Sequence, residues 1–170
     1  QKTHLNLSAP AGLIRAARGE LVAIGRNGKI VVIQLSEGKF QIARDGALST
    51  PVRVYATNPF GSLLVCCHPD ISKVNGLFLA KMEEKLFSDQ IENPTALSFS
   101  PDGRYLAIGN EIGTVKVIDI ATRQPAWSFD VSSTDLDGPV LHLAGIKQEG
   151  QPCWMAVYGN QNVAAWSLDG

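Results

Sequence analysis

The 170-residue chain lacks an excess of charge of either sign. Fifteen Lys and Arg residues stand against sixteen Asp and Glu residues, which gives a net charge of -1. Nucleic acids and anionic membranes bind proteins through clustered positive charge. The densest basic group is interleaved with apolar residues, as solvated strand positions are, and consists of Arg15, Arg18, Arg26 and Lys29. We therefore expect neither nucleic acid nor a membrane as a partner.

Long apolar runs are also missing. No run approaches the roughly 18 residues that a membrane helix needs, and no basic-then-apolar leader follows Gln1. An initiator Met is absent as well. We interpret the chain as a processed or excised piece, so that a leader upstream stays an open alternative.

Cysteine is scarce, with three residues at Cys66, Cys67 and Cys153. Neighbouring cysteines on a strand point to opposite faces and rarely pair with each other. An odd number with two adjacent members is not a disulfide framework. We expect free thiols and a reducing compartment, which favours a cytoplasmic location.

The chain does contain an internal repeat. Segments 21–25, 63–67 and 105–109 align without gaps, each beginning 42 residues after the one before, and residues 155–159 follow 50 residues later. A period of about 40–45 residues is typical of β-propeller blades, which have four strands each. The column formed by Gly25, Cys67, Gly109 and Gly159 is small throughout, which suits strands that converge on an axis.

Second apolar runs follow each segment after a turn, at residues 30–33, 77–80, 115–118 and 163–166. Asn27-Gly28 between two such runs is a strong hairpin signal, because both residues tolerate the positive φ of a type I′ turn. The turn at residues 68–76 is predicted to be longer. No stretch has the apolar spacing of a long amphipathic helix.

Further strands are predicted before and after these hairpins. First strands are expected at residues 13–17, 52–56, 96–100 and 140–144, and fourth strands at 40–43, 85–88 and 126–129. The chain is therefore predicted to be all-β, a β-propeller of about four four-stranded antiparallel blades. The blades cover residues 11–45, 51–90, 94–130 and 139–170.

Residues 97–109 resemble a WD40 repeat. The Ser100-Pro101-Asp102-Gly103 turn joins the first two strands, since Pro presets φ and Gly permits the reversal. Ile118-Asp119 and Trp166-Ser167 stand where this family has its Trp-Asp dipeptide. The resemblance to the WD40-repeat β-propeller family implies a non-catalytic scaffold for protein–protein interaction. The Gly-His dipeptide and the tight-turn Asp of the family are absent, so hydrophobic packing must hold the blades together.

Residues 119–127 resemble the tryptophan-docking motif of quinoprotein-like propellers, in which a Trp stacks on the next blade. Arg123 and Gln124 replace the usual Gly and Lys, and the motif occurs once. The resemblance implies a shared packing solution at Trp127 and no quinone cofactor. We likewise interpret Trp154 and Trp166 as blade packing.

The closure of the propeller stays open. The last predicted blade lacks a fourth strand, and the alternating residues 3–8 form a spare strand that would complete it. Completion would remove an exposed sheet edge. Closed propellers have typically four to eight blades. The chain is therefore a segment of a larger propeller, a closed four-bladed ring, or one of two copies that assemble an eight-bladed ring.

No catalytic or metal-binding constellation is predicted. Cys66-Cys67-His68 with Asp70 cannot converge on one tetrahedral ion from consecutive strand positions. Asp135-x-Asp137-Gly138 lacks the further oxygen ligands of a calcium loop. Residues 109–116 lack the Gly-Lys-Ser/Thr ending of a phosphate loop. The histidines His4, His68 and His142 have no matching nucleophile. We expect no enzyme, no metal and no cofactor.

The leading hypothesis is a non-catalytic scaffold that binds other proteins through loops on one face. The predicted partner-binding residues lie in loops that join second to third strands or consecutive blades: His68, Asp70, Lys73, Asn110, Glu111, Asp135, Asp137, Asn160 and Gln161. One alternative is a ligand-binding or enzymatic propeller, for which Arg15 and His142 are the polar candidates on innermost strands. The other is a regulatory sensor module of a longer protein.

Overall fold

The computed structural model describes residues 7, 9–68, 70–88, 91–129 and 138–167. These residues form fifteen strands and a single 3-10 turn at Ala17–Gly19, so the all-β prediction is confirmed. None of the described helical structure is long and apolar enough to cross a membrane.

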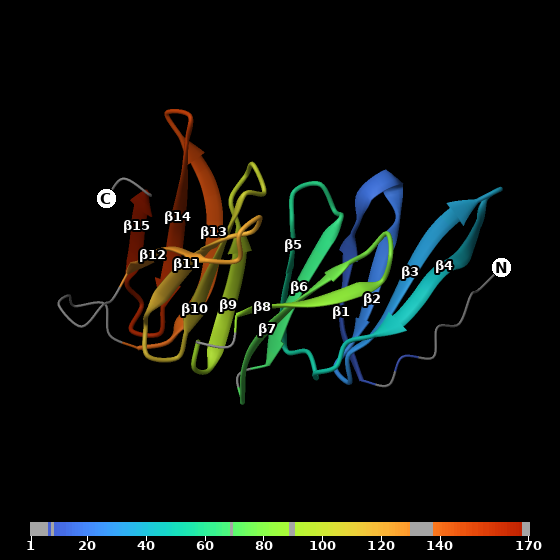
Figure 1. Cartoon of the computed structure of the whole chain (residues 1–170), viewed down its shortest axis with the longest axis horizontal. Helices are drawn as coiled ribbons and strands as arrows, with labels where there is room; N and C mark the ends of the chain where they lie inside the picture. The colour runs from blue at the N-terminus through green and yellow to red at the C-terminus, as the bar shows by residue number, and fades with distance from the viewer. Residues whose placement is uncertain (1–6, 8, 69, 89–90, 130–137, 168–170) are drawn as a thin grey trace.

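The strands form four antiparallel sheets in chain order, which are the propeller blades (Figure 1). The first blade contains β1 Pro10–Arg15, β2 Leu21–Gly25, β3 Lys29–Ser36 and β4 Lys39–Ala47. The second contains β5 Val54–Thr57, β6 Leu63–His68, β7 Ile71–Phe78 and β8 Glu83–Ser88. The third contains β9 Pro94–Phe99, β10 Tyr105–Asn110, β11 Val115–Asp119 and β12 Pro125–Phe129. The described part of the fourth contains β13 Val140–Gln148, β14 Gln151–Tyr158 and β15 Val163–Ser167.

The blades form an open arc in which the first and fourth blades lie at opposite ends (Figure 1). The first strands β5, β9 and β13 contact one another in turn. Each strand pairs with the strand that follows it in its blade. We call the sheet face toward the next blade the leading face, and the opposite face the trailing face. A closed ring of four blades is not formed by the described residues.

The predicted closing strand at residues 3–8 lies outside the described residues except for Leu7. Leu7 packs against Ala23, Val31 and Ile33 of the first blade. This contact lies at the end of the arc away from β15.

The turn between β1 and β2 of the first blade is one residue shorter than the corresponding turn in the second blade. The amide of Ala16 donates to the carbonyl of Glu20 (2.8 Å), which closes the turn between β1 and β2. The corresponding bond in the second blade runs from Asn58 to Leu63 (3.0 Å) and spans one residue more. The ungapped alignment of residues 21–25 with 63–67 is therefore wrong by one residue.

This offset exchanges the two faces of the strand, because strand side chains alternate with a period of two. Val22 and Ile24 lie on the leading face of the first blade and pack against the second. Leu64 and Cys66, 42 residues later, lie on the trailing face of the second blade and pack back against them.

Apolar side chains fill all three spaces between blades, as the missing polar network led us to expect. The first space is filled by residues that include Val22, Ile24, Val32, Leu64 and Leu77. The second is filled by residues that include Val65, Phe87, Phe99, Leu106 and Ile108. The third is filled by residues that include Ala107, Val117, Trp154, Tyr158 and Trp166.

Candidate interaction surface on the loop face

The loops predicted to share one face of the propeller do lie together. The amide of Leu48 donates to Gly28 (2.9 Å), and the amide of Arg53 donates to Cys67 (3.0 Å). Both bonds hold the linker between the first and second blades, one at the β2–β3 turn and the other near the end of β6. We call this side of the molecule the loop face, and the loop-face prediction is confirmed for the described residues.

The long loop predicted at residues 68–76 is wrong. β7 begins at Ile71, which pairs with His68, the last residue of β6. The polar composition of residues 72–75 concealed a strand in which Val74 is buried between the second and third blades. The amide of Asp70 donates to Nδ1 of His68 (3.2 Å), and Lys73 is exposed on the strand itself.

Asn75, which was predicted to lie in that loop, is a buried structural residue. Its side-chain amide donates to Oε1 of Glu84 (2.8 Å) on β8 and to Oγ1 of Thr50 (3.2 Å) in the linker. The amide and hydroxyl of Ser49 donate to the same Glu84 carboxylate (2.9 and 2.8 Å). This cluster fixes the linker between the first two blades to the outer strand of the second.

The remaining predicted residues have different positions. Asn110 is buried, and its Oδ1 accepts a hydrogen bond from the amide of Thr114 (2.8 Å), so it holds a turn. Glu111 is exposed on the loop face, where Nδ2 of Asn93 donates to its Oε1 (2.6 Å). The exposed Asn160 and Gln161 occupy the turn before β15. Asp135 and Asp137 lie outside the described residues.

A cavity of about 590 Å³ opens on the loop face at the inner ends of the second, third and fourth blades. It is lined by Arg53, Val54, Thr95, Glu111, Ile112, Pro139, Val140 and Leu141. The hydroxyl of Thr95 donates to the carbonyl of Val140 (2.6 Å), which holds the third and fourth blades together at its floor. Glu111 is therefore the predicted residue that belongs to the cavity.

The rim of this cavity combines apolar and charged side chains. Ile112 is 64% exposed and Leu141 is 47% exposed, although both are large aliphatic residues. The Glu111 carboxylate and the exposed Arg53 guanidinium supply charges of both signs. Ile112 follows Glu111 in the turn between β10 and β11. An isolated aliphatic residue in such a turn is the signal that was missed.

An irregular strand register explains why Leu141 is exposed. Val140 pairs with Tyr158 and His142 pairs with Val157, so the register shifts between Val140 and His142. Leu141 sits in this irregularity, which re-aims its side chain, as bulges commonly do. The single sequence contains no pattern that locates such a shift.

The polar candidates for an axial site do not meet. Arg15 lies at the turn end of β1 in the first blade, and His142 lies at the loop-face end of β13 in the fourth. Among the described residues, no group of three His, Cys, Asp or Glu side chains could hold a metal ion.

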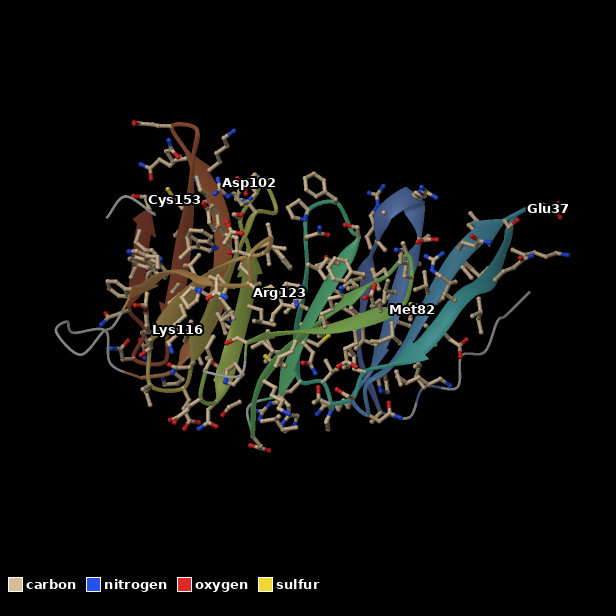
Figure 2. The ribbon with its side chains drawn as sticks, viewed as in Figure 1. Glu37, Met82, Asp102, Lys116, Arg123 and Cys153 are labelled. Atoms are coloured by element: carbon tan, nitrogen blue, oxygen red, sulfur yellow. The ribbon has the colours of Figure 1, made fainter. Side chains whose placement is uncertain are left out.

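The family-like turns lie away from this surface. Asp102 lies on the face opposite the loops (Figure 2), where its carboxylate accepts bonds from the Ser100 hydroxyl (2.6 Å) and the Arg104 amide (3.0 Å). Burial raises the pKa of Asp102, but these hydrogen bonds outweigh it and the pKa is lowered. The amide of Thr122 chiefly lowers the pKa of Asp119 by donating to its carboxylate. Both aspartates therefore act as turn-holding carboxylates.

Comparison with known proteins adds a fold relationship. No family model and no curated protein matches the chain. Among solved structures, hydrazine synthase from Kuenenia stuttgartiensis matches with a TM-score of 0.75 and 17% sequence identity. The match covers 99% of this chain and 49% of that chain, so this chain spans about half its length. At this identity the match shows the fold alone.

Proposed function

We propose that this protein is a non-catalytic scaffold of WD40-like blades that holds a segment of another protein on its loop face. The observation that carries the proposal is the exposure of Ile112 and Leu141 at the rim of the cavity. Exposed aliphatic side chains beside charges of both signs are typical of the core and rim of a protein–protein interface. The free thiols Cys66, Cys67 and Cys153 support a cytoplasmic location for this function.

The chemistry of the rim defines the partner segment. An apolar side chain of the partner would enter between Ile112 and Leu141 and displace water from both. Acidic and basic groups beside it would pair with Arg53 and Glu111 and fix its direction. Asn93 already orients Glu111 through the 2.6 Å hydrogen bond, so little ordering of that side chain is needed on binding.

The test is co-purification from the cells that contain the protein, with Ile112→Asp and Leu141→Asp as the variants. Phe60→Asp is the matched control, because Phe60 is 63% exposed in a turn on the opposite face. We expect a partner that is retained by the wild type and by the control and is lost from both loop-face variants. Retention of every partner by both variants contradicts the proposal.

An enzymatic or ligand-binding propeller is the alternative of another class. One of the solved structures that match is that of hydrazine synthase, an enzyme. Arg15 and His142, the polar candidates for such a site, lie in different blades at opposite ends of the arc and do not form one site together. A bound small molecule near the inner strands would favour this alternative.

A further inference from the structure

The two charged residues of the loop-face cavity belong to different blades. Arg53 directly precedes β5 of the second blade, and Glu111 lies in the turn between β10 and β11 of the third. Both side chains are exposed, and neither forms an ion pair with any residue that the structure describes. Each charge is therefore available to a group of opposite sign on a bound partner.

Two hydrogen bonds tie Glu111 to the linker that arrives from the second blade. Nδ2 of Asn93 donates to its Oε1 (2.6 Å), and the backbone amide of Glu111 donates to the carbonyl of Asn93 (3.2 Å). Asn93 ends this linker, because β9 begins at Pro94. The Glu111 carboxylate therefore has a defined place at the third blade, so that less side-chain entropy is lost when a partner binds.

The apolar part of the rim lies at the boundary between the third and fourth blades. Ile112 belongs to the third blade and is 64% exposed, and Leu141 belongs to the fourth and is 47% exposed. Because the blades follow one another along the arc (Figure 1), the rim presents its groups in a fixed order. Arg53 comes first, then Glu111, and then the pair formed by Ile112 and Leu141.

The spacing of the blades matches the spacing of side chains on an extended segment. Cα atoms of β5 and β9, and those of β9 and β13, approach to within 8 Å. Alternate side chains of an extended chain point to one side and lie about 7 Å apart. Three alternate side chains of one segment therefore reach from the fourth blade to the second. The cavity of about 590 Å³ has room for them, since ligand pockets measure about 300–1,000 Å³.

We infer that the loop face binds an extended segment in which three alternate residues are aliphatic, basic and acidic, in that order. The aliphatic side chain packs between Ile112 and Leu141, the basic group pairs with Glu111, and the acidic group pairs with Arg53. Exchanging the two charges of the segment would place a carboxylate against Glu111 and a cation against Arg53, which repel each other. This segment is the class of partner held under the proposed scaffold function, on which the inference rests.

Four synthetic peptides of one composition test the order of charges. Two carry Lys at the centre, Leu-Ser-Lys-Ser-Glu and its reverse, and two carry Glu at the centre, Leu-Ser-Glu-Ser-Lys and its reverse. Each pair includes both chain directions, so that direction does not affect the comparison. Fluorescence anisotropy of labelled peptides at low ionic strength should show that the better Lys-centred peptide binds about tenfold more tightly than either Glu-centred one. Equal affinities, a preference for Glu at the centre, or no binding of any peptide overturns the inference.

A charge exchange in the protein should invert this preference. Arg53→Glu combined with Glu111→Lys keeps the net charge and should favour the Glu-centred peptides by a similar factor. Arg26→Glu combined with Asp45→Lys is the matched control, because both residues are exposed in the first blade and neither lines the cavity. The control should keep the wild-type preference. The milder Glu111→Gln, with β content checked by circular dichroism, should lose the preference for a central Lys. Retention of the full preference by Glu111→Gln overturns the inference.

The variants Ile112→Asp and Leu141→Asp separate the order of charges from the proposed function. Both should weaken all four peptides, since every peptide contains Leu. Loss of a cellular partner from these variants, together with equal binding of all peptides by the wild type, would leave the scaffold function standing and overturn the inferred order. Retention of every cellular partner, together with the preference for a central Lys, would contradict the scaffold function and support the inferred order.

Discussion

Trp127 of the third blade stacks on Trp166 of the fourth, with ring centroids 6.0 Å apart and planes inclined by 19°. Phe129 extends the stack, with its ring centroid 5.4 Å from that of Trp166. The docking-type turn from Asp119 brings Trp127 to this position: Arg123 adopts a φ of 58°, and its amide donates to the Asp119 carbonyl (2.7 Å). A turn on one blade therefore positions the aromatic contact with the next.

Removing this stack should destabilise the fold measurably. Trp166 is buried, so Trp166→Ala should lower the free energy of unfolding by about 3–5 kcal/mol. Trp127→Ala should cost less, because Trp127 is half-buried. A double-mutant cycle followed by urea denaturation should yield a coupling of about 0.5–1.5 kcal/mol. A coupling of zero would show that the rings touch without stabilising each other.

Replacing Tyr158 should raise the stability of the fold. Its hydroxyl is buried in the space between the third and fourth blades and has no hydrogen-bond partner among the residues that the structure describes. Tyr158→Phe removes this unsatisfied group, and we expect the free energy of unfolding to rise by about 1 kcal/mol. Tyr55→Phe is the control, because the Tyr55 hydroxyl donates to the Ala11 carbonyl (3.5 Å). A loss of stability in Tyr158→Phe equal to that of the control would contradict the assignment.

Gly28 should be intolerant of a side chain for two separable reasons. Its φ is +86°, and an added Cβ would lie 2.7 Å from the carbonyl oxygen of Thr50. Gly38 has a similar φ of +73°, but nothing lies within 4 Å of its Cβ position. Gly38→Ala should therefore cost about 1–2 kcal/mol from backbone strain alone. Gly28→Ala should cost a further 1–3 kcal/mol, roughly, from the clash, and equal melting temperatures would refute the contact.

The period of the apolar segments sufficed to predict four blades, because each blade repeats the same strand–turn pattern. It did not reveal which face each strand presents. That depends on the length of the turn from Ala16 to Glu20, and the omission of one residue there leaves the apolar pattern of residues 21–25 intact. Residues 71–76 were missed because composition alone does not distinguish a polar loop from a strand whose buried Asn75 is satisfied by Glu84.

The face on which the candidate site lies was predicted, but only one of the residues that line its cavity was. The loop face followed from blade topology, and Glu111 was identified on it. Arg53, Ile112 and Leu141 were not, because their proximity arises from the packing of three blades and from the irregular register at Val140. Asn110 was predicted as a partner-binding residue, yet its side chain holds the turn itself.

The two adjacent buried cysteines should make the stability of the protein fall at alkaline pH. Cys66 faces the first blade and Cys67 the third, as alternation predicts for neighbours on a strand. Burial raises the pKa of the Cys67 thiol from 9.0 to about 12, and burial also raises the pKa of Cys66. The unfolded chain therefore loses these protons at a lower pH than the folded chain does. Stability contributed by the protonated thiols is present in full below pH 9 and is lost as the pH rises toward 12.

Cys67→Ala isolates this effect. The variant should be less stable than the wild type at pH 7.5, because a buried side chain is truncated. The difference between the two proteins should then shrink by about 1.4 kcal/mol per pH unit above pH 9, since only the wild type carries this thiol. Urea denaturation at several values between pH 7.5 and 11 measures both curves. Both proteins share Tyr158, so the titration of its buried hydroxyl cancels in the difference. A gap that stays constant with pH would mean that the Cys67 thiol ionises equally in the folded and unfolded states.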